Sequence, residues 1–161
     1  MKNAYIHYGS NKYDPDKFKP IKNNPMLAIP EGGLWASPKN AVFGWKEWYK
    51  CSDFQRCNID IFFEFTLSQN ARILQINCKD DLLDLPEADL PKEIPNHIIP
   101  WVCLDFEKLV ISGVDAIQVN MSNDLAIGFG DGLYNALYGW DCDSILVMNK
   151  EVIICEEETI K

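Results

Sequence analysis

The segment from Pro30 to Pro38, which reads PEGGLWASP, constrains the fold of this chain more than any other. Gly32 and Gly33 can adopt positive φ and allow another group to approach the backbone closely, and they precede a short apolar strand that carries Trp35. This combination predicts the wall of a pocket. Ser37 and Pro38 fit a helix N-cap followed by proline at the first helical position. We therefore expect the strand to lead directly into a helix that reaches Tyr49.

The expected helix is rich in aromatic residues. Val42, Trp45 and Trp48 recur at intervals of three. An indole face can pack in a core or stack on a flat heterocycle, and the spacing does not distinguish these uses. Core packing is the simpler interpretation for Trp48, whereas Trp35, beside the glycine pair, is the better candidate for stacking on a ligand.

The remaining apolar runs predict strands more often than helices. Strict alternation at residues 59–67 is the clearest strand signal, and His7 lies near the end of a β-prone run at residues 4–8. Further strands are expected at residues 72–76 and 114–119, and a hairpin at 143–155 with its turn at Asn149-Lys150. Strands with few short helices and no regular βαβ alternation indicate a single α+β domain over residues 1–161, built on two small sheets.

Composition limits the classes of partner. The 161 residues carry a formal net charge of −9 with only two arginines, which disfavours nucleic acid, anionic membrane surfaces and sites that clamp several phosphates. The six cysteines form no C-x-x-C pair and only two histidines are present, so no metal site is expected. Without an apolar leader or a long apolar span, the sequence favours reduced thiols and a cytoplasmic protein.

Common catalytic motifs are absent from the sequence. There is no G-x-S-x-G elbow, the glycine-rich segment 128–132 lacks the G-K-[ST] ending of a phosphate-binding loop, and His97 lies between prolines. What remains is a set of three separated residues: His7 at a strand end, Trp35 after the glycine pair, and Asp143 at the start of a strand.

In this order and spacing the chain resembles the ADP-ribosyltransferase superfamily, in the poly(ADP-ribose) polymerase and diphtheria toxin-like branch whose pattern is histidine, aromatic, acid. The similar segments are YIHYGS at 5–10, GGLWAS at 32–37 and DSILV at 143–147. Intervening strands look like those of bacterial and phage relatives. The resemblance implies a split β-sandwich of two mostly antiparallel sheets with short flanking helices.

The resemblance also implies roles for individual residues. His7 and Asp143 would be catalytic: His7 would bond a ribose hydroxyl of NAD, and Asp143 would stabilise positive charge as nicotinamide leaves. Trp35 would stack on nicotinamide, and the Trp45 indole would offer a second stacking face. Further contacts to NAD would come from Tyr8, Gly9, Ser10, Gly33 and Ser37.

Two departures from the family pattern concern the same site. Tyr8 stands where glycine usually follows the histidine, and Asp143 replaces glutamate. Aspartate is one methylene shorter, and a misplacement of about 1 Å can cost about 10²-fold in rate. Asp141 forms an acid-x-acid pair with Asp143, either as a group on the acceptor side or as a turn residue.

The function implied is mono-ADP-ribosyl transfer from NAD to a macromolecular acceptor, with protein favoured over nucleic acid, no membrane and no metal cofactor. One alternative is a catalytically inactive relative that binds NAD, ADP-ribose or a protein partner. Another is a coincidence of pattern, in which His7 and Trp35 are core residues and Asp143 caps a turn.

Overall fold

The computed structural model describes residues 3–24, 28–53, 57–89, 103–123 and 134–155. His97 and the glycine-rich segment 128–132 lie outside these ranges. Within them, none of the helices combines the length and the hydrophobicity that crossing a lipid bilayer requires.

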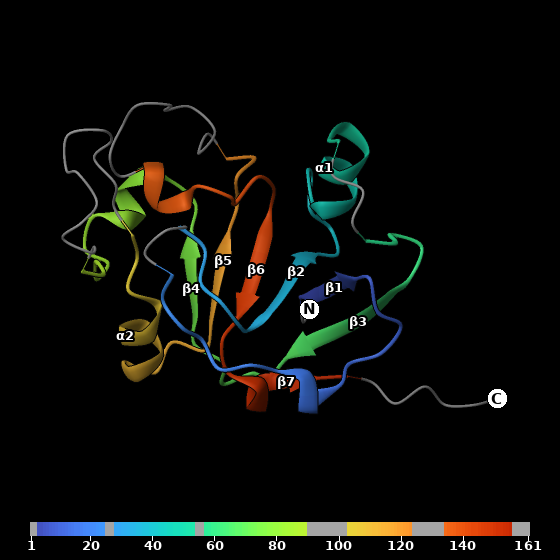
Figure 1. The fold of residues 1–161 in the computed structure, drawn as a ribbon, viewed down its shortest axis with the longest axis horizontal. Coiled ribbons are helices and arrows are strands. Elements are labelled where there is room, and N and C mark those ends of the chain that lie inside the picture. The colour runs from blue at the N-terminus through green and yellow to red at the C-terminus, as the bar shows by residue number, and fades with distance from the viewer. Residues whose placement is uncertain (1–2, 25–27, 54–56, 90–102, 124–133, 156–161) are drawn as a thin grey trace.

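Seven strands form one sheet in the order β4-β5-β6-β2-β1-β3-β7 (Figure 1). The strands are β1 (Ala4–Tyr8), β2 (Leu34–Pro38), β3 (Phe62–Leu67), β4 (Ile73–Ile76), β5 (Ala116–Val119), β6 (Ser144–Val147) and β7 (Ile153–Ile154). Among the strands of the described ranges, only β4 and β5 pair in parallel. The described residues also form the α-helices α1 (Trp45–Cys51) and α2 (Phe106–Ile111) and four short 3₁₀ turns. The α+β class is therefore confirmed.

The prediction of two sheets is wrong, because β2 pairs along both of its edges. Its first three residues pair with β6, from Leu34 opposite Val147 to Ala36 opposite Ile145. Its last two residues, Ser37 and Pro38, pair with β1. The two halves of the sheet are thus continuous, but only two residue pairs join β1 to β2.

The predicted C-terminal hairpin is also wrong. β6 lies between β5 and β2, whereas β7 pairs with β3 at the opposite edge of the sheet. The reason lies at Asn149, whose side chain accepts a hydrogen bond from the Glu151 amide (3.1 Å) and donates one to Asp115 (2.7 Å). These bonds start a 3₁₀ turn at Lys150–Val152, so the chain crosses the sheet instead of turning back.

Alternating side chains fill the two faces of the sheet. Ile117 and Leu146 belong to a core cluster that includes α2, and their neighbours Ala116 and Val147 belong to the cluster on the other face. The predicted alternation of Phe63, Phe65 and Leu67 toward a core is confirmed. The strand is shorter than expected because it begins at Phe62.

The helix after β2 begins later than the sequence predicts. Ser37 and Pro38 remain in β2 because they pair with β1, and the chain makes a loop before Gly44 caps α1. Val42, expected on the helix, lies in this loop and is 83% exposed. Figure 1 shows α1 beyond the end of β2, on the other side of the molecule from α2.

Candidate functional site

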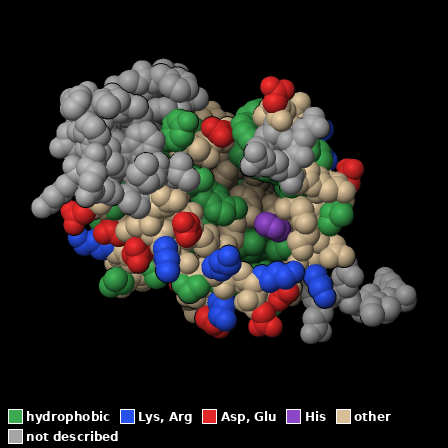
Figure 2. Space-filling model, in the orientation of Figure 1, with side chains coloured by type: hydrophobic (Ala, Val, Ile, Leu, Met, Phe, Trp, Pro, Cys, Tyr) green, Lys and Arg blue, Asp and Glu red, His purple; other side chains and the backbone are tan. Residues whose placement is uncertain are grey.

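A cavity of about 290 Å³ opens where β1 and β2 stop pairing. This volume lies just below the range of small-molecule sites, which span about 300–1,000 Å³. Figure 2 shows a hollow in this face of the molecule, with a histidine side chain on its wall. The described residues that line the cavity come from β1, β2, the start of α1, the start of β6 and the segments before β2, β3 and β6: Ile6, His7, Tyr8, Ile29, Trp35, Ala36, Ser37, Trp45, Cys57, Gly139, Asp141, Cys142 and Ser144.

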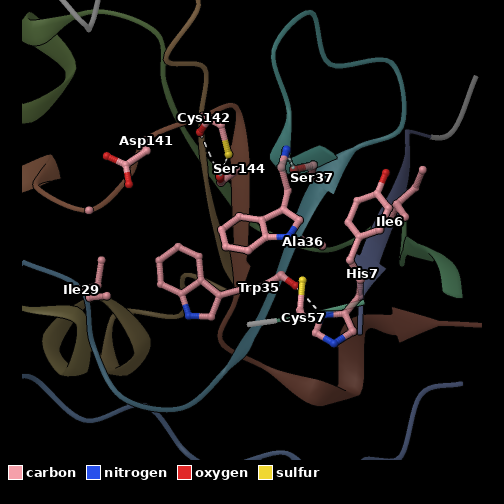
Figure 3. A pocket seen from close by; sticks show the side chains of 13 residues that line it. Ile6, His7, Ile29, Trp35, Ala36, Ser37, Cys57, Asp141, Cys142 and Ser144 are labelled. Atoms are coloured by element: carbon pink, nitrogen blue, oxygen red, sulfur yellow. Dashed lines mark hydrogen bonds between the residues drawn. The ribbon is translucent and has the colours of Figure 1, made fainter. Parts of the chain in front are cut away.

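His7 bridges the opening between the two strands. Its Nδ1 lies 2.7 Å from the carbonyl oxygen of Trp35 (Figure 3). Because a carbonyl oxygen only accepts, Nδ1 carries the proton in this bond. In the neutral imidazole, Nε2 is then the nitrogen that can accept a hydrogen bond from a hydroxyl group. Packing against Phe63, at a ring-centroid distance of 5.0 Å, further fixes the ring.

Two indoles contribute to the wall of the cavity. Trp35 is half-buried and lies edge-on to the fully buried Trp140, with ring centroids 4.6 Å apart. Trp45, at the first position of α1, also lines the cavity and pairs with Trp48 at a ring-centroid distance of 4.8 Å. The cavity therefore has one aromatic wall backed by the core and another carried by a surface helix.

Small polar side chains form the floor between β2 and β6. Ser37 and Ser144 are both buried, and the Ser144 hydroxyl donates to the carbonyl oxygen of Cys142 at 2.9 Å. Burial is the main cause that raises the pKa of the Cys142 thiol to about 11, so this thiol is neutral at physiological pH. The floor can offer hydrogen bonds to a ligand but no charge.

The two aspartates before β6 have different positions. Asp141 is exposed and lies on the rim of the cavity. Asp143 is 4% exposed, and its carboxylate accepts hydrogen bonds from the Ser122 amide (2.9 Å) and hydroxyl (2.8 and 3.0 Å). It is not among the lining residues, so the catalytic role inferred for Asp143 stays a prediction.

Three of the glycine and serine residues expected to contact NAD also lie off the cavity wall. Gly9 donates its amide to the carbonyl oxygen of Ile61, and the Ser10 hydroxyl bonds the carbonyl oxygen of Lys12. Gly33 has φ 69°, as its predicted freedom allows, but a Cβ there would lie 2.6 Å from Leu146 and 2.8 Å from the carbonyl oxygen of Val147. Its lack of a side chain serves close packing onto β6.

The sequence interpretation missed Cys57, Cys142 and Ser144 as lining residues. The sequence pattern could have identified only Cys142 and Ser144, because alternation along β6 places them on the face opposite Asp143. The strand register decides which of these two faces meets the cavity.

Charge on the cavity wall is sparse. None of the described lining residues is lysine or arginine. Burial raises the pKa of the Tyr8 phenol, with smaller contributions from the negative charges of Glu47 and Glu64, so Tyr8 is a neutral hydroxyl. Among the described residues, no group of three His, Cys, Asp or Glu side chains could hold a metal ion.

Comparison of the chain with models of protein families, with curated proteins and with solved structures finds no match.

Proposed function

We propose that this chain is a cytoplasmic mono-ADP-ribosyltransferase that uses NAD as donor and releases nicotinamide. One observation supports this most directly: His7 and Trp35, from two adjacent strands, meet in one cavity, and the segment before the third adjacent strand, β6, brings a carboxylate to its rim. This juxtaposition brings together the imidazole, indole and acid of the family pattern that the sequence resembles. The acceptor is a macromolecule, with protein favoured over nucleic acid because the net charge is −9.

The cavity suits the nicotinamide riboside half of NAD. The flat nicotinamide ring would stack on Trp35, with Trp45 on its second face. Nε2 of His7 would accept a hydrogen bond from a ribose hydroxyl, since Nδ1 is engaged by the carbonyl oxygen of Trp35. Because no lysine or arginine lines the described wall, the diphosphate would lie outside the cavity.

The acid best positioned to act is Asp141. As nicotinamide leaves with the electron pair of its bond to ribose C1′, positive charge develops on the sugar, and a fixed carboxylate stabilises this charge. Asp143 could do so only after releasing Ser122, and breaking hydrogen bonds to a charged group costs about 1.5–3 kcal/mol. We therefore assign the role to Asp141 and keep Asp143 as the alternative acid.

A second candidate function is binding without transfer. The hydrogen bonds between Asp143 and Ser122 favour it, because they hold the residue that matches the family acid away from the cavity. In that case the chain would bind NAD or ADP-ribose and release no nicotinamide.

The test has two stages. Titration calorimetry with NAD reports binding, and His7→Ala should weaken it about tenfold through loss of one hydrogen bond and ring contact. Nicotinamide release and transfer of label from NAD in a cell lysate then report catalysis. Asp141→Asn should lower release by about 10²-fold, as expected on loss of a group that stabilises transition-state charge.

Gln75→Ala, an exposed change on the edge strand β4, is the matched control and should leave both readouts unchanged. Loss of release in Asp143→Asn but not in Asp141→Asn would move the acid role to Asp143. NAD binding without any nicotinamide release would establish the second candidate, and absence of NAD binding would remove both.

A further inference from the structure

The helix that carries Trp45 is attached to the sheet at its beginning. α1 has seven residues, none of them buried, and helices shorter than about 12 residues are marginal in water unless other contacts hold them. Two hydrogen bonds hold the start of α1 and the residue before its N-cap to β2 and to the residue before β6. The Ser37 hydroxyl accepts from the Trp45 amide at 2.8 Å, and the carbonyl oxygen of Phe43 accepts from the Asp143 amide at 2.9 Å.

The junction between Ser37 and α1 is tightly packed. A Cβ at Gly44 would lie 3.2 Å from the Cβ of Ser37 and 3.3 Å from its hydroxyl oxygen. Ser37 itself is buried in β2, two residues after Trp35 and on the same face of the strand. The Ser37 side chain, labelled in Figure 3, therefore lines the cavity and also accepts a hydrogen bond from the backbone of Trp45, another lining residue.

We infer that Ser37 is a positioning residue: its hydroxyl fixes the first turn of α1 so that the Trp45 indole closes one side of the cavity. The inference rests on the proposed function for its consequence in NAD binding. It differs from the direct NAD contact expected of Ser37, because the hydroxyl oxygen already accepts the Trp45 amide proton. Ligand affinity then depends on Ser37 through the position of Trp45.

The inference is testable in the full chain labelled with 5-fluorotryptophan. The five tryptophans give separate fluorine resonances, and Trp45→Phe identifies that of Trp45. Ser37→Ala, and independently Gly44→Ala, should shift or broaden the Trp45 resonance in the ligand-free protein, and with it that of the neighbouring Trp48, while the resonance of the core residue Trp140 stays in place. In the presence of NAD the same variants should raise KM about tenfold and change kcat less than about threefold, as loss of uniform binding does.

Ser112→Ala is the matched control, because it removes a serine hydrogen bond to a helix carbonyl in α2 without touching the cavity. It should leave the Trp45 resonance and KM unchanged. A Trp45 resonance that does not move in either variant would overturn the inference, as would equal shifts of all resonances, which indicate a general structural role. If the wild type does not bind NAD, the proposed function fails, whereas the ligand-free resonance still decides the role of Ser37.

Discussion

Nδ1 of His7 lies 2.7 Å from the carbonyl oxygen of Trp35, at the point where the pairing of β1 with β2 ends after Ile6 and Ser37. Beyond these pairs, the imidazole itself bonds a backbone carbonyl of the neighbouring strand. It therefore holds the two strands at a fixed separation while the gap between them becomes the cavity. The spacing of β1 and β2 and the proposed contact to the NAD ribose therefore depend on the same imidazole ring.

The dual role of His7 predicts a combined effect of its replacement. His7→Phe keeps a ring against Phe63 but leaves the carbonyl oxygen of Trp35 without its partner. The free energy of unfolding should fall by about 0.5–1.5 kcal/mol, the net contribution of a hydrogen bond between partly buried groups. Urea unfolding measures this value, and Gln75→Ala provides the control. An unchanged unfolding free energy would show that the bond contributes nothing to holding the strands.

Local patterns in the sequence were enough to predict several elements of the fold. Alternation identified the buried face of β3, and the apolar run around Trp35 identified β2. The errors arose where distant partners decide the outcome. Pairing with β1 keeps Ser37 and Pro38 in β2, and the side-chain bond of Asn149 to Asp115 sends the chain away from a hairpin.

The same limit applies to the candidate site. His7, Trp35, Ser37, Trp45 and Asp141 were expected near a ligand and do line the cavity. The position of Asp143 could not be predicted, because a shift of one residue in register exchanges the two faces of a strand. Pairing of Ala36 with Ile145 sets that register and turns Ser144, instead of Asp143, toward the cavity.

Asp143 should act mainly on stability. Ser122→Ala and Asp143→Asn each weaken charge-assisted hydrogen bonds at a buried carboxylate, and each should lower the free energy of unfolding by about 1–3 kcal/mol. Because the two side chains contact each other, the double variant should lose less than the sum of the single losses. Asp141→Asn, an exposed change, should stay within about 0.5 kcal/mol of the wild type. Additive losses in the double variant would contradict the contact.

Replacing Gly33 with alanine should destabilise the fold more than the same replacement at Gly9. Both have positive φ, 69° and 95°, so alanine introduces backbone strain at either position. At Gly33 the added Cβ would also meet the carbonyl oxygen of Val147 at 2.8 Å, whereas at Gly9 its nearest neighbour is the Cβ of Cys57 at 3.6 Å. Gly33→Ala should therefore cost more than Gly9→Ala, by about 1–3 kcal/mol for the additional clash. Thermal or urea unfolding of the two variants gives the difference directly, and equal losses would exclude the packing role of Gly33.

Cys142 should make stability depend on pH in the alkaline range. Burial raises the pKa of its thiol to about 11 from the usual value of 9.0, so the folded chain retains a proton that the unfolded chain releases. This contribution is complete below pH 9 and is lost as the pH rises to 11, and at 1.36 kcal/mol per pKa unit it amounts to about 2–3 kcal/mol. Urea unfolding at about pH 8 and about pH 11 should show a smaller decrease in the free energy of unfolding for Cys142→Ala than for the wild type.

Tyr5, Tyr8 and Tyr13 also have raised pKa values, chiefly through burial, and remain in both chains, so the comparison isolates the thiol. Cys78→Ala, at an exposed cysteine, should keep the wild-type decrease, and an equal decrease in Cys142→Ala would mean that the Cys142 thiol is not shielded from water.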